Sequence, residues 1–453
     1  MSRVALLIAV VASAVPSIAW AQRVTFELLP APGGLTGARV AAISPDASLV
    51  VGTGSTQTQS GILWQTAQAP ATLSFLAGGT ILNAVSSSPA RLAGTTFTPL
   101  GEPRAMLATL GQPPALAQLP AGITNSPGGS SATGISADGT RACGWAIDAA
   151  GVTRALLWTN LIPAVVAPPS GLASGRLTAI SRDAVTIAGD AVSVATGRSV
   201  GWARVSGQSF VMPNPPGLTP VAVMLLGVSD GAAPFVCGGV VVESSGQFAI
   251  RPVLWQPSTG QVTTLSTPDL SDGLAWAINA NAQTVVGQAG NRAAAWFVNS
   301  GLQHPPVNFS QYLTQNGAPG LDQFELIETT AVSADGAVFA GRAQDSLGRS
   351  IGFRAAFIQE PPPPPPPPPP SDACPIVDVA DFQGKTTVDG GGPNGIVDAN
   401  DITAFLSAMT AGVLTVADIA DFLGLTILDG GGPDGVLDES DLTTFLAMLA
   451  EGC

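Results

Sequence analysis

The feature that most constrains the fold is a phrase that recurs seven times in the first 360 residues. In each copy, Ile or Val is followed by Ser or Asn, a few small residues, a short apolar run and a closing Gly. The copies begin at Ile43, Val85, Ile135, Ile180, Val228, Ile278 and Val332, and they close at Gly52, Gly94, Gly144, Gly189, Gly238, Gly287 and Gly341. Closing glycines 42 to 54 residues apart indicate an array of like structural units.

Most copies continue with a second apolar phrase that ends in Trp, at Trp64, Trp158, Trp202, Trp255 and Trp296; the last copy has Phe357 instead. A third short apolar phrase follows, so each copy supplies about four short strands separated by turn residues. At Asp138-Gly139 and Asp335-Gly336, Gly stands where a tight hairpin needs a positive φ. This content is typical of a propeller blade, and we predict a mainly β chain with a seven-bladed β-propeller over residues 22–360.

The two ends of the array predict how the ring closes. The seventh copy stops at Phe357 and Ile358 before a proline run, so its fourth strand is missing. A strand-like phrase, Val24 to Leu29, precedes the first copy. If that phrase completes the last blade, no sheet edge is left open. The alternative is an open β-solenoid, which would not need the displaced strand.

The repeated Trp residues allow two interpretations. Aromatic faces stack on sugar rings, but a residue demanded once per blade favours packing between neighbouring sheets. Cys143 and Cys237 share one strand position in copies three and five. Non-adjacent blades would hold their Cα atoms beyond the roughly 7 Å limit for a disulfide, so we predict two buried free thiols.

The repeat phrases resemble the bacterial extracellular repeats named for a His-Ala-Phe signature that is usually followed by Leu-Trp. The matching positions here read Arg-Ala-Leu-Leu-Trp at Arg154 to Trp158. The resemblance covers about Val24 to Ile358, and it implies an extracellular repeat architecture without a settled activity.

Charge and rare residues narrow the classes of function. The net charge is −14, and the first 370 residues hold 17 acidic residues against 16 Arg, so the acidity belongs to the last part of the chain. This balance argues against nucleic-acid binding, which needs clustered Lys and Arg. The chain has one His (His304), one Lys (Lys385) and one Tyr (Tyr312), which leaves little for His-based catalysis.

The ends of the propeller segment are marked by composition. Arg3, an apolar run and Ala19-Trp20-Ala21 predict a cleaved signal peptide over residues 1–21 and a secreted or cell-surface protein. No later segment has the length of a membrane span. The ten prolines of residues 361–370 predict a stiff polyproline linker of roughly 30 Å, followed by a module over 371–453.

That module is a duplication with the spacing of a calcium loop. Each copy contains Asn or Asp, Gly, two residues, Asp, two residues and Asp, followed by apolar residues at helical spacing. With Gly at position 6 of the loop, positions 5, 7, 9 and 12 supply oxygen ligands to a hard cation. The predicted ligands are Asn394, Ile396 (carbonyl), Asp398 and Asp401 in the first loop and Asp434, Val436 (carbonyl), Asp438 and Asp441 in the second. We therefore predict two Ca²⁺ sites; the alternative is a pair of solvated Asp-Gly turns.

The loop-and-helix pair resembles type I dockerin modules, an EF-hand-like family, including divergent bacterial versions that end in Gly-Cys as Gly452-Cys453 does. The resemblance covers about Cys374 to Cys453 and implies protein–protein interaction with a cohesin-like or other surface protein. It leaves the first ligand of each loop open between Asp381 and Asp389, and between Asp421 and Asp429. Cys374 and Cys453 bracket the module, which favours a disulfide in an exported protein; the alternative is attachment through Cys453.

Together these patterns predict a secreted, non-catalytic recognition or scaffold propeller, attached through a calcium-dependent module to a partner or surface assembly. The propeller would bind polysaccharide or protein. Two alternatives stay open. A polysaccharide-degrading glycosidase or lyase would need two non-repeat carboxylates about 5–10 Å apart in the central funnel. A structural surface-layer protein would self-assemble instead.

Overall fold

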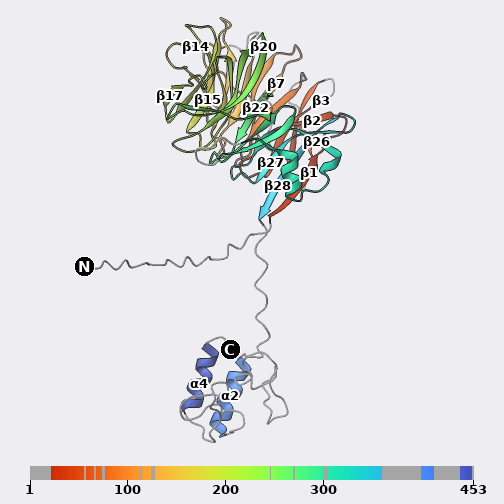
Figure 1. The fold of residues 1–453 in the computed structure, drawn as a ribbon, viewed down its shortest axis with the longest axis vertical. Helices are drawn as coiled ribbons and strands as arrows, with labels where there is room; N and C mark the ends of the chain where they lie inside the picture. The colour runs from red at the N-terminus through yellow and green to blue at the C-terminus, as the bar shows by residue number, and fades with distance from the viewer. Residues whose placement is uncertain are drawn as a thin grey trace, which may run out of the picture. The chain divides into compact units, whose positions relative to one another are not determined.

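The computed structural model describes residues 22–359, apart from 56–57, 66–67, 74–76, 113–114, 124–127, 245, 269–270 and 299–304, together with 399–412 and 439–450. The chain divides into two compact units, Ala21–Glu360 and a unit that contains the two C-terminal helices. The first unit is built of seven four-stranded antiparallel sheets arranged as the blades of a ring (Figure 1).

The blades follow one another along the chain, with the first strand of each blade innermost. Blade 1 is β2 (Thr36–Ile43), β3 (Leu49–Ser55), β4 (Gln59–Gln65) and β5 (Ala71–Leu73). Blade 2 is β6 (Thr80–Val85), β7 (Arg91–Phe97), β8 (Pro103–Thr109) and β9 (Ala115–Leu116). Blade 3 is β10 (Ser130–Ile135), β11 (Arg141–Ile147), β12 (Thr153–Thr159) and β13 (Ile162–Val166).

Blade 4 is β14 (Leu172–Ile180), β15 (Thr186–Ser193), β16 (Ser199–Val205) and β17 (Gln208–Val211). Blade 5 is β18 (Pro220–Val228), β19 (Val236–Ser244), β20 (Gln247–Gln256) and β21 (Gln261–Thr264). Blade 6 is β22 (Gly273–Ile278), β23 (Thr284–Ala289), β24 (Arg292–Phe297) and β25 (Val307–Asn308). Blade 7 is β26 (Phe324–Val332), β27 (Val338–Asp345), β28 (Ser350–Gln359) and β1 (Gln22–Leu29).

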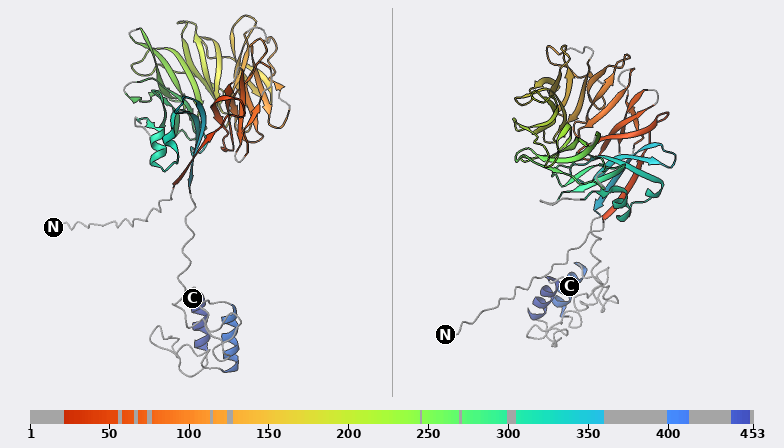
Figure 2. Two further views of the ribbon diagram at one scale, coloured as in Figure 1. Left: turned by 90° about the vertical axis from the view of Figure 1, so that its right-hand side faces the viewer. Right: turned by 45° about the horizontal axis from the view of Figure 1, so that its top comes forward.

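The N-terminal strand closes the ring, as the sequence predicts. β1 pairs antiparallel with β28, with Val24 opposite Phe357 and Leu28 opposite Phe353. The two strands, red and blue, lie side by side in every view (Figure 2). The innermost strands contact one another in the cyclic order β2, β6, β10, β14, β18, β22, β26 and back to β2. The seven-bladed propeller is therefore confirmed, and the open solenoid is wrong because its terminal units would not meet.

The repeated Ser or Asn ends each inner strand and holds the turn that follows. Its side-chain oxygen accepts a backbone N–H at the start of the next strand, in Ser44, Ser86, Ser136, Ser181, Ser229, Asn279 and Ser333. All seven are buried, so this bond satisfies a backbone donor that water does not reach. Gly139 and Gly336 have φ of 66° and 79°, which confirms the positive φ predicted for these Asp-Gly turns.

The residue after that Ser or Asn links each blade to the next through the backbone. Its N–H donates to the carbonyl of the equivalent residue one blade on, from Ser87 to Ala137, Ala137 to Arg182, Asp230 to Ala280, Ala280 to Ala334 and Ala334 to Pro45. Side chains complete the remaining two links, from the Arg182 N–H to Asp230 and from the Asp46 N–H to Ser87. Hydrogen bonds therefore join all seven blades in a closed cycle at this face of the disc.

The closing Gly of each copy has one structural cause. Each inner strand carries a β-bulge, an extra residue that leaves the ladder locally disrupted. The seven bulge residues are Ala41, Asn83, Thr133, Thr178, Leu226, Trp276 and Thr330. A Cβ on the closing Gly of the neighbouring strand would overlap the carbonyl oxygen of the residue two places before the bulge, in all seven blades. Only Gly fits there.

The repeated Trp residues form the packing between blades. Trp64, Trp158, Trp202, Trp255 and Trp296 are between 0% and 4% exposed, which confirms the packing interpretation. Trp158 and Trp296 also donate from Nε1 to the carbonyls of Gln118 and Ser266. These two indoles therefore bury large apolar areas with their N–H groups paired, whereas the buried indole N–H groups of Trp202 and Trp255 have no partner among the described residues.

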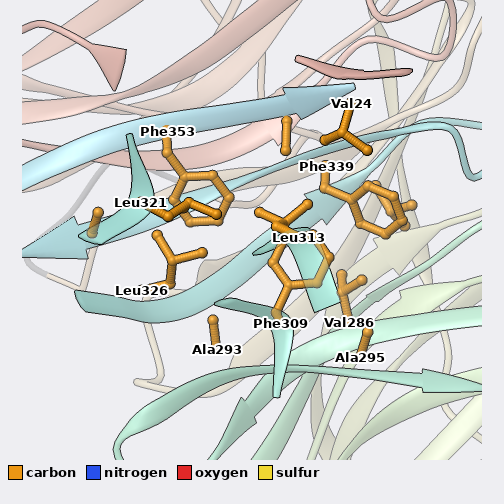
Figure 3. Close-up of a cluster of buried hydrophobic side chains, with 13 residues drawn as sticks. Val24, Val286, Ala293, Ala295, Phe309, Leu313, Leu321, Leu326, Phe339 and Phe353 are labelled. Atoms are coloured by element: carbon orange, nitrogen blue, oxygen red, sulfur yellow. The ribbon is translucent and has the colours of Figure 1, made fainter. Parts of the chain in front are cut away.

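A short helix covers the side of the ring where it closes. Helix α1 (Phe309–Gln315), capped by Asn308, and a 3₁₀ turn, η2 (Leu321–Gln323), lie between blades 6 and 7. Phe309 and Leu313 are buried against β1, β26, β27 and β28 (Figure 3). The ring centroids of Phe309 and Phe339 lie 4.9 Å apart, and Phe309 also contacts Phe353. The closure therefore has its own aromatic core.

The second unit contains two helices, α2 (Ala399–Ala411) and α4 (Glu439–Ala450), where the sequence predicts them. Phe405 and Phe445, equivalent in the two copies, are fully buried and stacked with centroids 4.0 Å apart. The sequence spacing predicts apolar faces of Ile402, Phe405, Leu406 and Met409 and of Leu442, Phe445, Leu446 and Leu449. This prediction is partly wrong, because Leu406 and Leu446 are 45% and 50% exposed while Ala404 and Ala408 are buried. Within the described ranges, no helix has the length and apolar character needed to cross a membrane.

Candidate functional site

A pocket of about 720 Å³ lies at the centre of the ring and is lined largely by residues of the inner strands. All seven bulge residues line it, so every blade contributes one side chain at the same level. A bulge re-aims its side chain and disrupts the local ladder. The fold therefore fixes the positions of these seven lining residues, whereas the type of residue differs from blade to blade.

Four of the bulge side chains bind the next blade. Asn83, Thr133, Thr178 and Thr330 each donate to the carbonyl of the residue just before the next bulge, in Ala132, Leu177, Leu225 and Val40. The other three, Ala41, Leu226 and Trp276, make no such bond. The indole N–H of Trp276 is buried and has no partner among the described residues. The pocket thus combines a hydrogen-bonded polar wall with an aromatic and apolar one.

Among the described lining residues, Arg39 alone has an ionisable side chain. It stands two residues before the bulge of its inner strand, β2. The Arg39 Nε donates to Glu328 Oε1 at 2.9 Å, and its guanidinium carbon lies 5.2 Å from the centre of the Trp276 ring. Glu328 is 3% exposed and also pairs with Arg342 Nε at 3.1 Å. Two arginines surround one carboxylate, so this corner carries a net positive charge.

The opposite part of the wall is polar with one further indole. Trp145 on β11 stands across the ladder from Ser131 on β10. The hydroxyls of Ser131 and Thr95 are 2.6 Å apart, and Asn83 lies within hydrogen-bond reach of Ser131. Trp145 and Ser131 both line the pocket and are contributed by the same blade. Hydroxyl and amide groups that can both donate and accept thus lie beside an aromatic face.

Arg182 spans the opposite end of the channel. It lies in the turn after β14 of blade 4, and its Nη1 and Nη2 donate to the carbonyls of Ile278 in blade 6 and Val332 in blade 7. Its side chain therefore narrows that end of the channel. Burial lowers the pKa of this guanidinium, while Asp230 and Asp335 act in the other direction. Because arginine stays protonated in proteins, Arg182 also places a fixed positive charge there.

Two carboxylates that do not belong to the repeated phrase lie near the bulges, Glu328 on β26 and Asp190 on β15. Glu328 belongs to blade 7, and Asp190 to blade 4, where Arg176 Nε donates to Asp190 Oδ1 at 2.7 Å. Burial raises the pKa of Asp190, and Arg176 partly offsets that effect. Each carboxylate is held by arginine, and neither is among the described residues that line the pocket. Neither carboxylate is therefore offered free to the pocket by the described residues.

The aspartates two residues after the repeated Ser are turn residues. Asp46, Asp138, Asp183 and Asp335 each accept a hydrogen bond from the Ser hydroxyl two residues earlier. In Asp138 that Ser136 bond is the main cause that holds the carboxyl pKa below its ordinary value. In Asp46 and Asp183, burial acts to raise the carboxyl pKa, and the hydrogen bonds together outweigh it, so the pKa is lowered there too.

The structure describes the two predicted free thiols, whereas most of the predicted metal ligands lie outside the described residues. Cys143 and Cys237 are free and fully buried, which confirms that prediction, and burial raises the pKa of both thiols to about 12. Cys374 and Cys453 lie outside the described residues, as does the single His, His304. So do ten of the predicted metal ligands, Asp381, Asp389, Asn394, Ile396, Asp398, Asp421, Asp429, Asp434, Val436 and Asp438.

Two predicted ligands fall on described helices. Asp401 lies in the first turn of α2, and Asp441 lies in the first turn of α4 and is 1% exposed. Within the described ranges, no cluster of three or more His, Cys, Asp or Glu side chains could hold a metal ion. The calcium sites stay a prediction.

The central pocket is not predicted by the sequence pattern. One signal was present: among the propeller's Trp residues, Trp145 and Trp276 alone depart from the repeat position, and both line the pocket. Arg39 offered no such signal because it occupies an ordinary strand position. The bulge positions were not recognisable either, since they are filled by Ala, Asn, Thr, Leu and Trp.

No protein-family model and no curated protein matches this chain. Solved structures similar to it include the propeller domain of the trilobed protease from Pyrococcus furiosus, at 9% identity and a TM-score of 0.45, over 72% of this chain and 100% of that one. An oligogalacturonate lyase in complex with manganese has 14% identity and a TM-score of 0.44, over 75% and 98%. TolB from Acinetobacter baumannii has 15% identity and a TM-score of 0.36, over 62% and 67%. These likenesses concern the fold alone.

Proposed function

We propose that the protein is a secreted recognition module whose propeller binds a ligand in the central pocket. The observation that carries the proposal is the place of the residues that depart from the sevenfold pattern. The repeated Ser, Gly and Trp positions are used for turns, close backbone approach and packing. Arg39, Trp145 and Trp276 belong to none of these positions, and all three line the same pocket.

The chemistry of the lining favours binding over bond cleavage. Most lining residues are Thr, Ser, Asn, Gln or apolar, and the described lining contains one guanidinium already fixed by Glu328. A pocket of this kind, concave and partly apolar with a few placed polar groups, is typical of a ligand site. Its size, about 720 Å³, suits a ligand of one or two ring units.

We also propose that the C-terminal module binds Ca²⁺ and then attaches the protein to a partner or surface assembly. The duplicated loop spacing supports this. So does the place of Asp441, an acidic side chain buried in the first turn of α4, next to the positive end of the helix dipole. Because calcium ligands are carboxylates, binding would couple to ordering of the module.

The test of the propeller site uses the full chain on immobilised glycan and peptide arrays, followed by calorimetry with each ligand found. Trp145→Ala and Trp276→Ala should each weaken binding at least tenfold. Phe248→Ala is the matched control, since Phe248 is 65% exposed on β20 and outside the pocket. Binding that is unchanged in both Trp variants would contradict a central site.

The test of the module is Ca²⁺ titration of the full chain by calorimetry. We expect binding heat that falls when Asp398 and Asp438 are both changed to Asn, and none of that loss in Asp372→Asn, an acidic residue of the same segment outside both loops. Pull-down of surface proteins with and without chelator then tests attachment. Binding heat equal in the double variant and the parent would contradict the proposed ligands.

A further inference from the structure

We infer that the ligand of the central pocket is an acidic glycan, bound with a uronate carboxylate on Arg39 and a sugar ring on the indole wall. This inference rests on the proposed function of the pocket and names the class of ligand.

The Nη amino groups of Arg39, which lines the pocket, are free to bind a ligand. Within the described chain, its side chain makes one hydrogen bond, from Nε to Glu328. Glu328 and the face of Trp276 fix the plane of the guanidinium, and the side chain is 53% exposed. The two Nη amino groups therefore stay available in a defined orientation. A guanidinium held in this way matches the two oxygens of a carboxylate bidentately, which a Lys ammonium does not.

The charges around Arg39 favour an anion over a neutral or cationic ligand. Glu328 is shared between Arg39 and Arg342, so the three groups together carry one net positive charge. The other described lining residues are uncharged. A carboxylate entering the pocket would thus meet a single fixed cation and no competing anion in the lining.

The rest of the lining favours a sugar over the carboxyl terminus of a peptide. Trp145 and Trp276 both line the pocket, and the Arg39 guanidinium lies over the ring of Trp276, so Trp145 is the indole on which a pyranose ring can stack without displacing that contact. Ser131, Thr95 and Asn83 offer hydroxyl and amide groups of both polarities, which suits the hydroxyls of a sugar. Because Arg182 narrows the far end of the channel, the pocket receives the end of a glycan chain rather than its middle.

The experiment titrates the full-length protein with uronic-acid oligosaccharides of alginate, polygalacturonate and glucuronan, each compared with its own methyl ester. The acid form of at least one should bind, and its ester should bind at least tenfold more weakly, because the ester removes the charge and keeps the ring. Raising the NaCl concentration should weaken the acid form. Peptides with free and amidated carboxyl termini form a second arm.

Arg39→Gln and Arg39→Lys test the residue. Each should weaken the acid form about tenfold or more, with Lys retaining charge but losing the fork, and neither should change binding of the ester. Arg154→Gln is the matched control, because Arg154 is 44% exposed, pairs with Asp148 at 2.8 Å and lies outside the pocket. Circular dichroism of each variant checks that the fold is kept.

Several outcomes would overturn the inference. One is equal binding of acid and ester, another is unchanged affinity in both Arg39 variants, and a third is binding of carboxyl-terminal peptides but of no uronate. In the first two cases, a loss of binding in Trp145→Ala would show that the pocket binds a ligand, so the proposed function would survive. Binding of none of the probes would overturn the inference as well.

Discussion

Arg39 and Glu328 lie 289 residues apart in the sequence, and a hydrogen bond of 2.9 Å joins their side chains. Each occupies the second position before the bulge of its inner strand, Arg39 in blade 1 and Glu328 in blade 7. Blade 7 contains both the last strand of the array and the N-terminal strand β1. The pair therefore joins the first blade to the one that closes the ring, and it also orients the guanidinium in the pocket.

Glu328→Gln should destabilise the fold by about 1–3 kcal/mol, because a buried carboxylate that holds two arginines is lost. Urea unfolding of the full chain measures this. Glu27→Gln is the control, since Glu27 pairs with Arg354 but is 55% exposed, and it should cost less than about 1 kcal/mol. Equal losses in the two variants would contradict a structural role specific to Glu328.

Gly189→Ala should destabilise blade 4 by about 1–3 kcal/mol or more, because its Cβ would overlap the carbonyl oxygen of Arg176. The atoms that the added Cβ would meet belong to the backbone of Arg176 and Leu177, which cannot move aside as a flexible side chain can. Gly33→Ala is the matched control, since nothing lies within 4 Å of its added Cβ. Thermal unfolding compares the two, and a neutral Gly189→Ala would show that the bulge can shift.

The sequence predicts those features of the fold that recur. Seven copies predict seven blades, and the missing fourth strand of the last copy predicts that β1 completes it. Helix α1 is not predicted, although Asn308 offers a cap and Phe309, Tyr312 and Leu313 have helical spacing. Seven residues are too short for periodicity alone to identify a helix, and its stability comes from packing on blades 6 and 7.

The pocket could not be predicted for a different reason. Its residues come from all seven blades, and one from each blade is brought to the channel by a bulge that leaves no residue-type signature. The contact between Arg39 and Glu328 depends on ring closure and on equal register in blades 1 and 7. Such a contact follows from three-dimensional closure, not from any local pattern.

Thiol titration should separate the four cysteines. Cys143 and Cys237 are fully buried, and a thiol with its pKa raised to about 12 is a poor nucleophile. We expect neither to react with an aromatic disulfide reagent in the native protein, and both to react in guanidinium. If Cys374 and Cys453 form the predicted disulfide, the denatured, unreduced chain will show two thiols. Four thiols would contradict that disulfide.

Acid should weaken the turns that Asp46, Asp138 and Asp183 hold. The Ser136 bond lowers the pKa of Asp138 below its ordinary value of 3.8. The native state therefore binds fewer protons than the unfolded state, and this stabilisation, present above about pH 3.8, is lost as the pH falls through the native pKa. Asp138→Asn should reduce the steepness of the loss of stability between pH 4 and 2, measured by urea unfolding at each pH. An unchanged profile would exclude this contribution.

Phe309→Ala should loosen the closure of the ring more than any exposed substitution. Phe309 is 0% exposed, and its ring packs on Phe339 and Phe353 at 4.9 and 6.2 Å. Loss of a buried Phe typically costs about 3–5 kcal/mol. Because Phe309 packs on β27 and β28, and Val24 of β1 belongs to the same cluster, we expect β1 to detach first. Amide hydrogen exchange should then rise in β1 and β28 before it rises in blades 3 to 5.

Phe248→Ala, at 65% exposure, is the control and should leave the free energy of unfolding within about 0.5 kcal/mol of the parent. Uniform exchange through all blades in Phe309→Ala would instead mean that the ring unfolds as one cooperative unit, with no separate weakness at its closure.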